Sequence, residues 1–141
     1  MTPDQVKLVQ QSFTRVAPIA EQAAVMFYGR LFEIAPAVKP LFHGDMAEQR
    51  RKLMATLAAV VGGLHDIESI LPTASALAQR HVGYGVKPEH YGYVGEALLW
   101  TLRQGLGPAW TDEQAAAWSA AYATLSGFMV GEAYGRNQAA E

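Results

Sequence analysis

The sequence predicts an all-α fold, and two observations support that prediction. Between short turn signals the apolar residues recur with a helical period, and no segment alternates with the period of two typical of a half-buried strand. The chain has 141 residues, half of them hydrophobic, and shows no internal repeat, which suits one compact domain that buries roughly 70% of its unfolded surface. We therefore expect about seven helices in a single domain over residues 1–141.

Charge and composition exclude several classes of function. A net charge of −2 predicts no affinity for nucleic acid. Cysteine is absent, so disulfides and thiolate metal sites are excluded and histidine is the natural soft-metal ligand. The most apolar stretch, residues 53–64, is shorter than the ~20 residues of a membrane span, so no membrane insertion is expected. The first residues do not resemble a secretory signal, and we expect a cytoplasmic protein.

Proline and capping residues divide the first half of the chain. Thr2 as N-cap and Pro3 at the first helical position open a helix that Pro18 ends or kinks. The second helix carries an apolar stripe formed by Ala20, Ala24, Phe27, Tyr28, Leu31 and Phe32. After a turn that holds two prolines, a third helix is expected over residues 46–64, with one face formed by Gln49, Leu53, Leu57, Val60 and Leu64.

The second half is divided in the same way. Pro72 is expected to start a shorter helix that carries Leu77 and His81 one turn apart and stops at glycine. Pro88 is expected to begin the next helix, whose stripe is Tyr91, Val94, Leu98 and Leu102. Thr111 begins the last helix as N-cap in a capping box, and the buried stripe of that helix is Trp118, Tyr122, Leu125 and Met129.

Four strings in a fixed order carry a more specific signal. They are FYGRLFEIAPAVKPLF at 27–42, EQRRKLM at 48–54, RHVGYGV at 80–86 and HYGYVGEALL at 90–99. With them the sequence resembles the bacterial single-domain haemoglobins and the globin domain of flavohaemoglobins, from about Val6 to Tyr134. The resemblance implies a globin fold around haem b, which is iron protoporphyrin IX.

His81 matches the proximal histidine of this family. Haem iron needs one strong axial ligand from the protein and an open sixth position if it is to bind a gas, and a neutral imidazole supplies that ligand. An isolated histidine on a helix also fits a surface or core position. The surrounding strings favour the metal ligand.

Tyr28 and Gln49 match the distal side of the family's haem pocket. Dioxygen on ferrous haem gains partial negative charge, so a hydrogen-bond donor stabilises it by roughly 1.5–3 kcal/mol. Tyr28 offers a hydroxyl and Gln49 an amide that donates but ligates iron poorly. Tyr28 also fits an ordinary core aromatic, and Gln49 also fits a polar residue at a helix start.

The remaining candidates are walls and supports of the pocket. Phe42 matches the phenylalanine that wedges against the haem plane, and Lys52 in a basic run is the candidate for a haem propionate, although a solvated ion pair contributes only about 0–1 kcal/mol. For the apolar walls the core and the pocket interpretations coincide: Phe32, Leu53, Leu57, Leu77, Val86, Val94, Leu98 and Met129, with Tyr122 beside them.

The second shell of the proximal histidine departs from the family pattern. Tyr91 matches the family's tyrosine, but the position of the accompanying glutamate falls on Ala133. The nearest carboxylate, Glu132, lies some 80° around the helix at about 100° per residue. Either a local shift in the last helix restores Glu132, or the network is incomplete.

The resemblance implies ligands such as O2, NO and CO. The leading hypothesis is reversible oxygen binding with nitric oxide dioxygenase capability, which depends on an external reductase because no reductase domain is expected in this chain. The alternatives are oxygen storage, delivery or scavenging without turnover, and a globin-fold module without haem. We expect a monomer or weak homodimer, and we expect His43, in the loop after Phe42, to face solvent.

Overall fold

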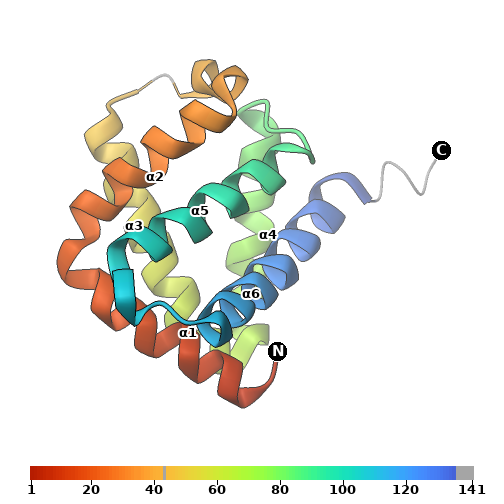
Figure 1. Ribbon diagram of the computed structural model, residues 1–141. Helices are drawn as coiled ribbons and strands as arrows, with labels where there is room; N and C mark the ends of the chain where they lie inside the picture. Colours follow the sequence, from red (N-terminus) through yellow and green to blue (C-terminus); the bar gives the residue numbers. More distant parts are fainter. Residues whose placement is uncertain (43, 136–141) are drawn as a thin grey trace.

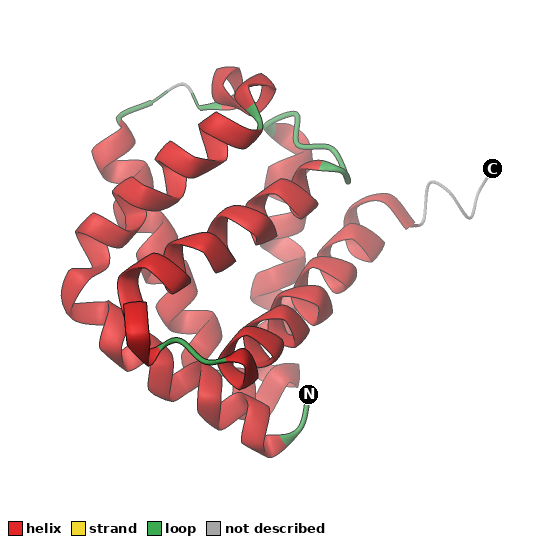
Figure 2. Ribbon diagram, viewed as in Figure 1, coloured by secondary structure: helices red, strands yellow, loops and turns green. Residues whose placement is uncertain are grey.

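The computed structural model describes residues 1–42 and 44–135, and within them it contains helices and no strand (Figure 2). The six α-helices are α1 (Pro3–Val16), α2 (Ala20–Ile34), α3 (Met46–Gly62), α4 (Ile67–Gly83), α5 (His90–Leu106) and α6 (Asp112–Val130). Short 3-10 turns, η1 (Ala17–Ile19), η2 (Pro36–Leu41), η3 (Leu64–Asp66) and η4 (Gly107–Ala109), lie between them, and a π-helical turn, η5 (Gly131–Gly135), follows α6. The predicted all-α class is confirmed.

The helix starts that rest on capping chemistry are where the sequence predicts them. The Thr2 and Thr111 side chains each accept the backbone N–H three residues on, and a glutamine at that position returns the bond. These reciprocal bonds satisfy donors that would otherwise lack partners at a helix start. Pro18 lies in the η1 turn that separates α1 from α2, as its missing N–H requires.

The predicted start of the fourth helix at Pro72 is wrong. Helix α4 begins at Ile67, and Pro72 lies inside it. The upstream turn forms because Ile70 is buried and packs closely against Gly63, where a Cβ would lie 2.4 Å from the Ile70 Cγ2 atom. This packing stabilises a helical turn ahead of the proline and outweighs the one hydrogen bond that the proline removes.

Two other helix boundaries, the end of α3 and the start of α5, differ from the predicted ones by a few residues. Helix α3 ends at Gly62, because the chain turns at Gly63 into η3 before Leu64. Helix α5 begins at His90 and not at Pro88, and the His90 Nδ1 atom accepts the Lys87 N–H at 3.0 Å just before the helix. Both differences arise where side chains or short turns satisfy backbone groups that a regular helix would otherwise pair.

The helices pack in pairs that are distant in sequence. Figure 1 shows α2 and α5 running side by side at the front, with α3 and α4 behind them. Helix α1 packs against α6, where the Trp118 Nε1–H donates to Ser12 Oγ at 2.8 Å in a fully buried contact. Helix α4 packs chiefly against α6 and η5. Helix α4 is therefore held in place mainly by the C-terminal part of the chain.

No single helix in the described ranges combines the length and apolar composition that crossing a membrane requires. The segments Met46–Gly62 and Leu64–Gly83 meet that criterion only as a pair, and the pair is bent by 53°.

Helices α5 and α6 approach so closely at Gly95 that this position requires a glycine. A Cβ at this position would lie 2.6 Å from the Tyr122 Cε2 atom. We expect Gly95→Ala to lower the free energy of unfolding by about 1–3 kcal/mol, because the ring or the helix must move. Gly92→Ala on the same helix is the matched control, since nothing lies within 4 Å of its Cβ, and it should gain about 0.5–1 kcal/mol of helix propensity. Urea unfolding of both variants measures the difference, and equal effects would contradict the close approach.

Candidate functional site

The His81 side chain is oriented by its own helix. It lies in the last turn of α4, and its Nδ1 atom is 2.8 Å from the Leu77 carbonyl oxygen. A carbonyl oxygen only accepts, so Nδ1 carries the proton and Nε2 keeps a free lone pair. Burial, aided by the positive charge of Arg80 and opposed by the bond to Leu77, lowers the pKa of His81 below its ordinary value. The imidazole is therefore neutral at pH 7 and suited to ligate a metal.

Tyrosines lie near His81. The Tyr91 ring stacks against the imidazole, with 6.3 Å between ring centroids and planes tilted by 28°. The Tyr122 hydroxyl, from α6, donates to the Tyr91 carbonyl at 2.5 Å and fixes the start of α5. The Tyr91 hydroxyl is buried and has no hydrogen-bond partner within the described residues. Burial, with Tyr134 close by, raises the pKa of Tyr91 to about 12.

Glu132 does not pair with Tyr91. The α-helix gives way to the π-helical turn η5 at Gly131, so a local shift does occur in the last helix. The Glu132 carboxylate nevertheless accepts the Ser75 hydroxyl of α4, with Ser75 Oγ 3.0 Å from Glu132 Oε1. Of the two outcomes that the sequence leaves open, the structure has the incomplete network. Ala133 packs in the apolar cluster beside α4.

Tyr28 and Gln49 are brought together from α2 and α3. The Gln49 Nε2 atom donates to the Tyr28 hydroxyl oxygen at 3.2 Å. Because that oxygen accepts from Gln49, the Tyr28 O–H remains free to donate to a third group. Tyr28 is buried, and burial raises the pKa of its phenol while the bond from Gln49 opposes the shift. The pair therefore presents one neutral, oriented hydrogen-bond donor.

An aromatic cluster supports this donor. The ring centroid of Phe42 lies 5.4 Å from that of Tyr28 and 5.4 Å from that of Phe32, in edge-on arrangements. Such edge-to-face contacts are favoured by the ring quadrupoles and restrict ring rotation. Phe42, directly after η2, thus borders Tyr28.

The predicted wall residues divide between two hydrophobic clusters. Phe32, Phe42, Leu53, Leu57, Val94, Leu98 and Tyr122 belong to the cluster that contains Tyr28. Leu77, Val86, Tyr91 and Met129 belong to a second cluster, built on α4. Leu53, Leu57, Leu77, Val86 and Val94 are only half-buried, so apolar surface is available on both clusters. A neutral imidazole bonded to Leu77 of the second cluster, a hydrogen-bond donor in the first and half-buried apolar side chains on each are the groups that haem binding requires.

Some candidates lie outside this arrangement. Lys52 is exposed and its Nζ atom lies 3.6 Å from Glu48 Oε1 one turn away, a solvated ion pair. His43 lies outside the described residues. Within residues 1–42 and 44–135, no three His, Cys, Asp or Glu side chains group together to hold a metal ion, so His81 would act as a single protein ligand.

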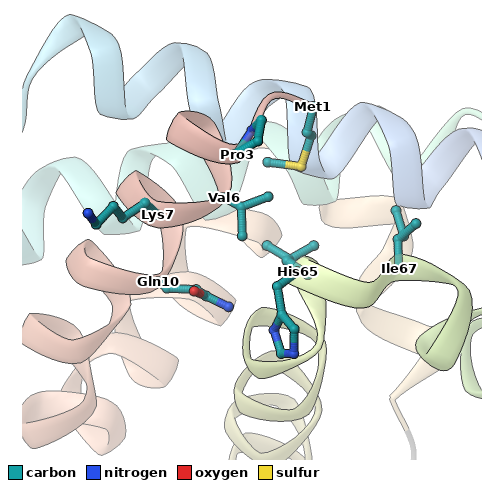
Figure 3. A pocket seen from close by; sticks show the side chains of 8 residues that line it. Met1, Pro3, Val6, Lys7, Gln10, His65 and Ile67 are labelled. Carbon is teal, nitrogen blue, oxygen red and sulfur yellow. The ribbon is translucent and has the colours of Figure 1, made fainter.

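A separate groove of about 440 Å³ lies at the far end of α4. It is formed between the start of α1 and the η3 turn, and Figure 3 shows Lys7, Gln10 and His65 around it. Ile67 at this groove and His81 are separated by about 21 Å along the axis of α4, at 1.5 Å per residue. The groove is therefore remote from the residues assembled above.

Sequence reasoning did not identify Ser75, Gln79 and Tyr134 as parts of the site. The Gln79 Nε2 atom donates to the Glu132 carbonyl at 3.0 Å, and the Tyr134 hydroxyl donates to the Val86 carbonyl. Each is a single polar residue with no periodic pattern, and each partner lies about fifty residues away. Nothing in the local sequence signals these pairs.

An all-helical fold that carries a neutral, oriented histidine and a separate polar pair, each beside apolar side chains, fits the class of helical haem proteins. The family model for globins matches residues 25–129, so the chain belongs to the globin family. It is 34% identical over 134 residues to a flavohemoprotein of Bordetella parapertussis, covering 93% of this chain and 33% of that protein. It is 35% identical over 118 residues to a flavohemoprotein of Rhizobium meliloti, covering 79% of this chain and 29% of that protein. The chain thus spans about a third of the length of these curated relatives.

Solved structures agree with this assignment. A bacterial globin from Campylobacter jejuni superposes with a TM-score of 0.84 at 25% identity, covering 97% of this chain and 99% of that one. An engineered carbene transferase, itself a presumed nitric oxide dioxygenase of Rhodothermus marinus, superposes with a TM-score of 0.86 at 25% identity, covering 100% of this chain and 99% of that one. The predicted globin fold is confirmed.

The raised pKa of Tyr122 predicts how stability changes at high pH. Burial and the neighbouring Tyr91 raise its pKa above the value of about 10 in an unfolded chain. The folded state thus holds the phenol proton more tightly, and this contribution is complete below pH ~10 and lost as the pH rises above it. We expect Tyr122→Phe to cost about 0.5–1.5 kcal/mol at pH 7 through the lost bond to Tyr91, and to weaken the alkaline decline.

Chemical unfolding at pH 7 and at several values above pH 10 measures this effect. Tyr93→Phe is the control, because Tyr93 is 39% exposed on α5. An alkaline decline as steep in Tyr122→Phe as in the unchanged chain would contradict the prediction.

Proposed function

We propose that this chain binds haem b through His81, holds dioxygen and related diatomic ligands near Tyr28, and oxidises nitric oxide to nitrate when an external reductase is present. The observation that carries the proposal is that one fold holds both an Nδ1-protonated His81, bonded to Leu77 of one hydrophobic cluster, and a Tyr28–Gln49 hydrogen bond at the other cluster. The relatives named flavohemoproteins and the structural neighbour from Rhodothermus marinus support the same chemistry.

Haem, when bound, supplies an iron centre that coordinates a diatomic gas and exchanges one electron. His81 would hold it through the free Nε2 lone pair, and the bond from Nδ1 to Leu77 keeps the ring from rotating. The half-buried apolar side chains of both clusters would cover the flat faces of the group and exclude water from them.

The distal pair acts on the gas ligand. Gln49 donates to the Tyr28 oxygen, which aims the Tyr28 O–H at a third partner. A partly negative oxygen atom accepts that proton best, so the pair favours dioxygen over less polar ligands. The raised pKa of Tyr28 keeps the phenol protonated and able to donate throughout the neutral range.

Nitric oxide, dioxygen and one electron combine to give nitrate, so each turnover consumes an electron. We propose that a flavin-containing reductase supplies it, because the curated relatives are flavohemoproteins about three times the length of this chain. Oxygen storage, delivery or scavenging needs the same distal pair but no electron supply, and it is the second candidate because the Tyr28–Gln49 bond also favours slow oxygen release.

Haem ligation by His81 predicts a specific spectrum. The chain reconstituted with haem should show a strong Soret band that shifts when carbon monoxide is added to the reduced protein. His81→Gly should lose the histidine-ligated ferrous spectrum and regain it with added imidazole, because the missing ligand is then supplied from solution. His65→Ala, at the remote groove, should leave the spectrum unchanged. An unaltered spectrum in His81→Gly would assign the ligand to another residue.

Tyr28 predicts the rate of oxygen release. Removing its hydroxyl in Tyr28→Phe should speed oxygen dissociation by about 10- to 150-fold, the equivalent of a hydrogen bond of roughly 1.5–3 kcal/mol. Stopped-flow mixing measures this rate, and Tyr93→Phe serves as the control.

The same apparatus separates the two candidate functions. Mixing the oxygen-equilibrated ferrous chain with nitric oxide should give nitrate in proportion to haem and leave ferric protein. If nitrate forms only once even with a reductase and its electron source present, the chain is a storage or scavenging protein. If no nitrate forms at all, the dioxygenase proposal fails while haem binding stands.

A further inference from the structure

Tyr84 lies exposed beside the candidate haem ligand. It directly follows α4, and at 60% exposed it is the most exposed large hydrophobic side chain among the described residues. Its ring centroid lies 6.3 Å from that of His81. Tyrosine is enriched in protein–protein interfaces, where its ring supplies contact area and its hydroxyl stays in contact with water. Tyr84 therefore offers a partner protein a contact next to the histidine.

Two exposed cations accompany Tyr84 at the end of α4. Arg80 precedes it by four residues, so the two side chains lie on the same side of the helix, about 40° apart around the axis. Lys87 follows in the loop that leads to α5. Among residues 1–42 and 44–135, no carboxylate forms an ion pair with either cation. Their charges are therefore available to a partner.

The loop after α4 meets the η2 turn, which brings a third cation to this place. A Cβ at Gly85 would lie 3.4 Å from the Leu41 Cδ2 atom. Lys39 lies two residues before Leu41, and Lys87 lies two residues after Gly85, and both lysines are exposed. The Lys39 Nζ atom is 6.0 Å from the ring centroid of Phe32, in the aromatic cluster that supports Tyr28. We call Lys39, Arg80, Tyr84 and Lys87 the basic surface.

The end of the molecule that carries the basic surface differs in charge from the whole chain. Figure 1 shows the start of α3, the end of α4 and the loop after α4 at the same end of the molecule. Residues 36–52 and 80–89 form this end and contain six Lys or Arg and three Asp or Glu, a net charge of +3. The whole chain carries −2. Such an asymmetric field attracts an acidic partner and orients it before contact.

The size and position of the basic surface favour an electron donor as this partner. Transient electron-transfer encounters bury less than about 1,200 Å² in total, so a few contact residues are enough. Their speed comes from electrostatic steering and not from buried area. A donor also has to bring its redox group near the iron, because electron transfer slows steeply with distance. The basic surface allows this approach, since Tyr84 is exposed to solvent and its ring is close to that of His81.

We propose that the basic surface is the docking site of an acidic protein that donates single electrons, with Tyr84 as the central contact and the three cations as steering charges. The proposal rests on the proposed function in taking His81 as the haem ligand and in requiring one electron for each turnover. The step moves one electron and no atoms. The redox group of the donor protein is oxidised by one electron, and ferric haem is reduced to ferrous haem.

Stopped-flow reduction of the ferric, haem-loaded chain tests the steering charges. The probe is a reduced flavodoxin, an acidic carrier that gives up one electron. In the double variant Lys39→Glu/Lys87→Glu the second-order rate at low salt should fall about tenfold or more, because electrostatic steering changes association rates by roughly 10- to 1,000-fold. The difference should nearly vanish at about 1 M salt, where the Debye length is only ~3 Å. Equal rates in the double variant and the unchanged chain at low salt overturn the proposal.

Two substitutions test Tyr84 separately. Tyr84→Ser removes the ring and should slow reduction by flavodoxin about fivefold or more, as the loss of a central interface side chain does. Tyr84→Phe keeps the ring and should keep the rate of the unchanged chain. If Tyr84→Ser is reduced as fast as Tyr84→Phe, the tyrosine is not the central contact and the proposal fails.

Two controls separate docking from damage to the haem site. Lys7→Glu reverses an equally exposed lysine of α1 at the remote groove, and its rate should stay within about twofold of the unchanged chain. Dithionite is a small reductant that needs no docking site, so it should reduce all the variants at similar rates. Variants of the basic surface that are slowed equally with dithionite and with flavodoxin overturn the proposal.

A binding measurement is independent of electron transfer. Oxidised flavodoxin added to the isotope-labelled chain should shift the amide signals of residues 39, 80, 84 and 87, and it should leave the double variant unchanged. Signals that respond to vesicles of anionic phosphatidylglycerol but not to flavodoxin would assign the surface to a membrane. Signals that respond only to the concentration of the chain would assign it to a second copy. Either result overturns the proposal.

The outcomes also separate this proposal from the proposed function. If flavodoxin docks and reduces the haem but nitric oxide yields no nitrate, the dioxygenase function fails and the docking surface stands. If another electron source sustains nitrate formation while flavodoxin leaves the signals of the basic surface unchanged, the docking surface fails and the proposed function stands.

Discussion

Helix α4 carries His81 in its last turn and is held in place mainly by α6 and η5. The orientation of the imidazole depends on this placement. The bond from Nδ1 to Leu77 fixes the ring relative to the helix, but it does not fix the helix relative to the molecule. Contacts from α6 and the π-helical turn do that. The site therefore depends on how the C-terminal part of the chain meets α4.

The Tyr28–Gln49 part of the candidate site is built differently. Tyr28 and Gln49 come from α2 and α3, which belong to the larger cluster, and their partners are side chains of that same cluster. The aromatic rings of Phe32 and Phe42 pack around Tyr28 and limit its motion. This part can thus keep its geometry without help from α4.

The features that the sequence predicts correctly arise from interactions between residues close together in the chain. Thr2 and Thr111 cap helices through bonds to residues three positions away, so their role is encoded locally. The start of α4 is different, because the burial of Ile70 against Gly63 forms a helical turn ahead of Pro72 that no local propensity indicates. Glu132 is a similar case. Placing Glu132 by a rotation of about 100° per residue assumes that the last α-helix is continuous. The π-helical turn that begins at Gly131 breaks this continuity, so the position cannot be obtained from the sequence in that way.

By itself the sequence determined the helical class, most helix boundaries, and His81, Tyr28 and Gln49 as the candidate site residues. These follow from periodicity, caps and four recognisable strings, all of which act over a few residues. Only the tertiary structure decided that Glu132 bonds to Ser75, that Tyr134 reaches Val86, and that the apolar residues form two clusters. Those outcomes depend on contacts between segments about fifty residues apart, where the packing of whole helices and not local preference selects the partner.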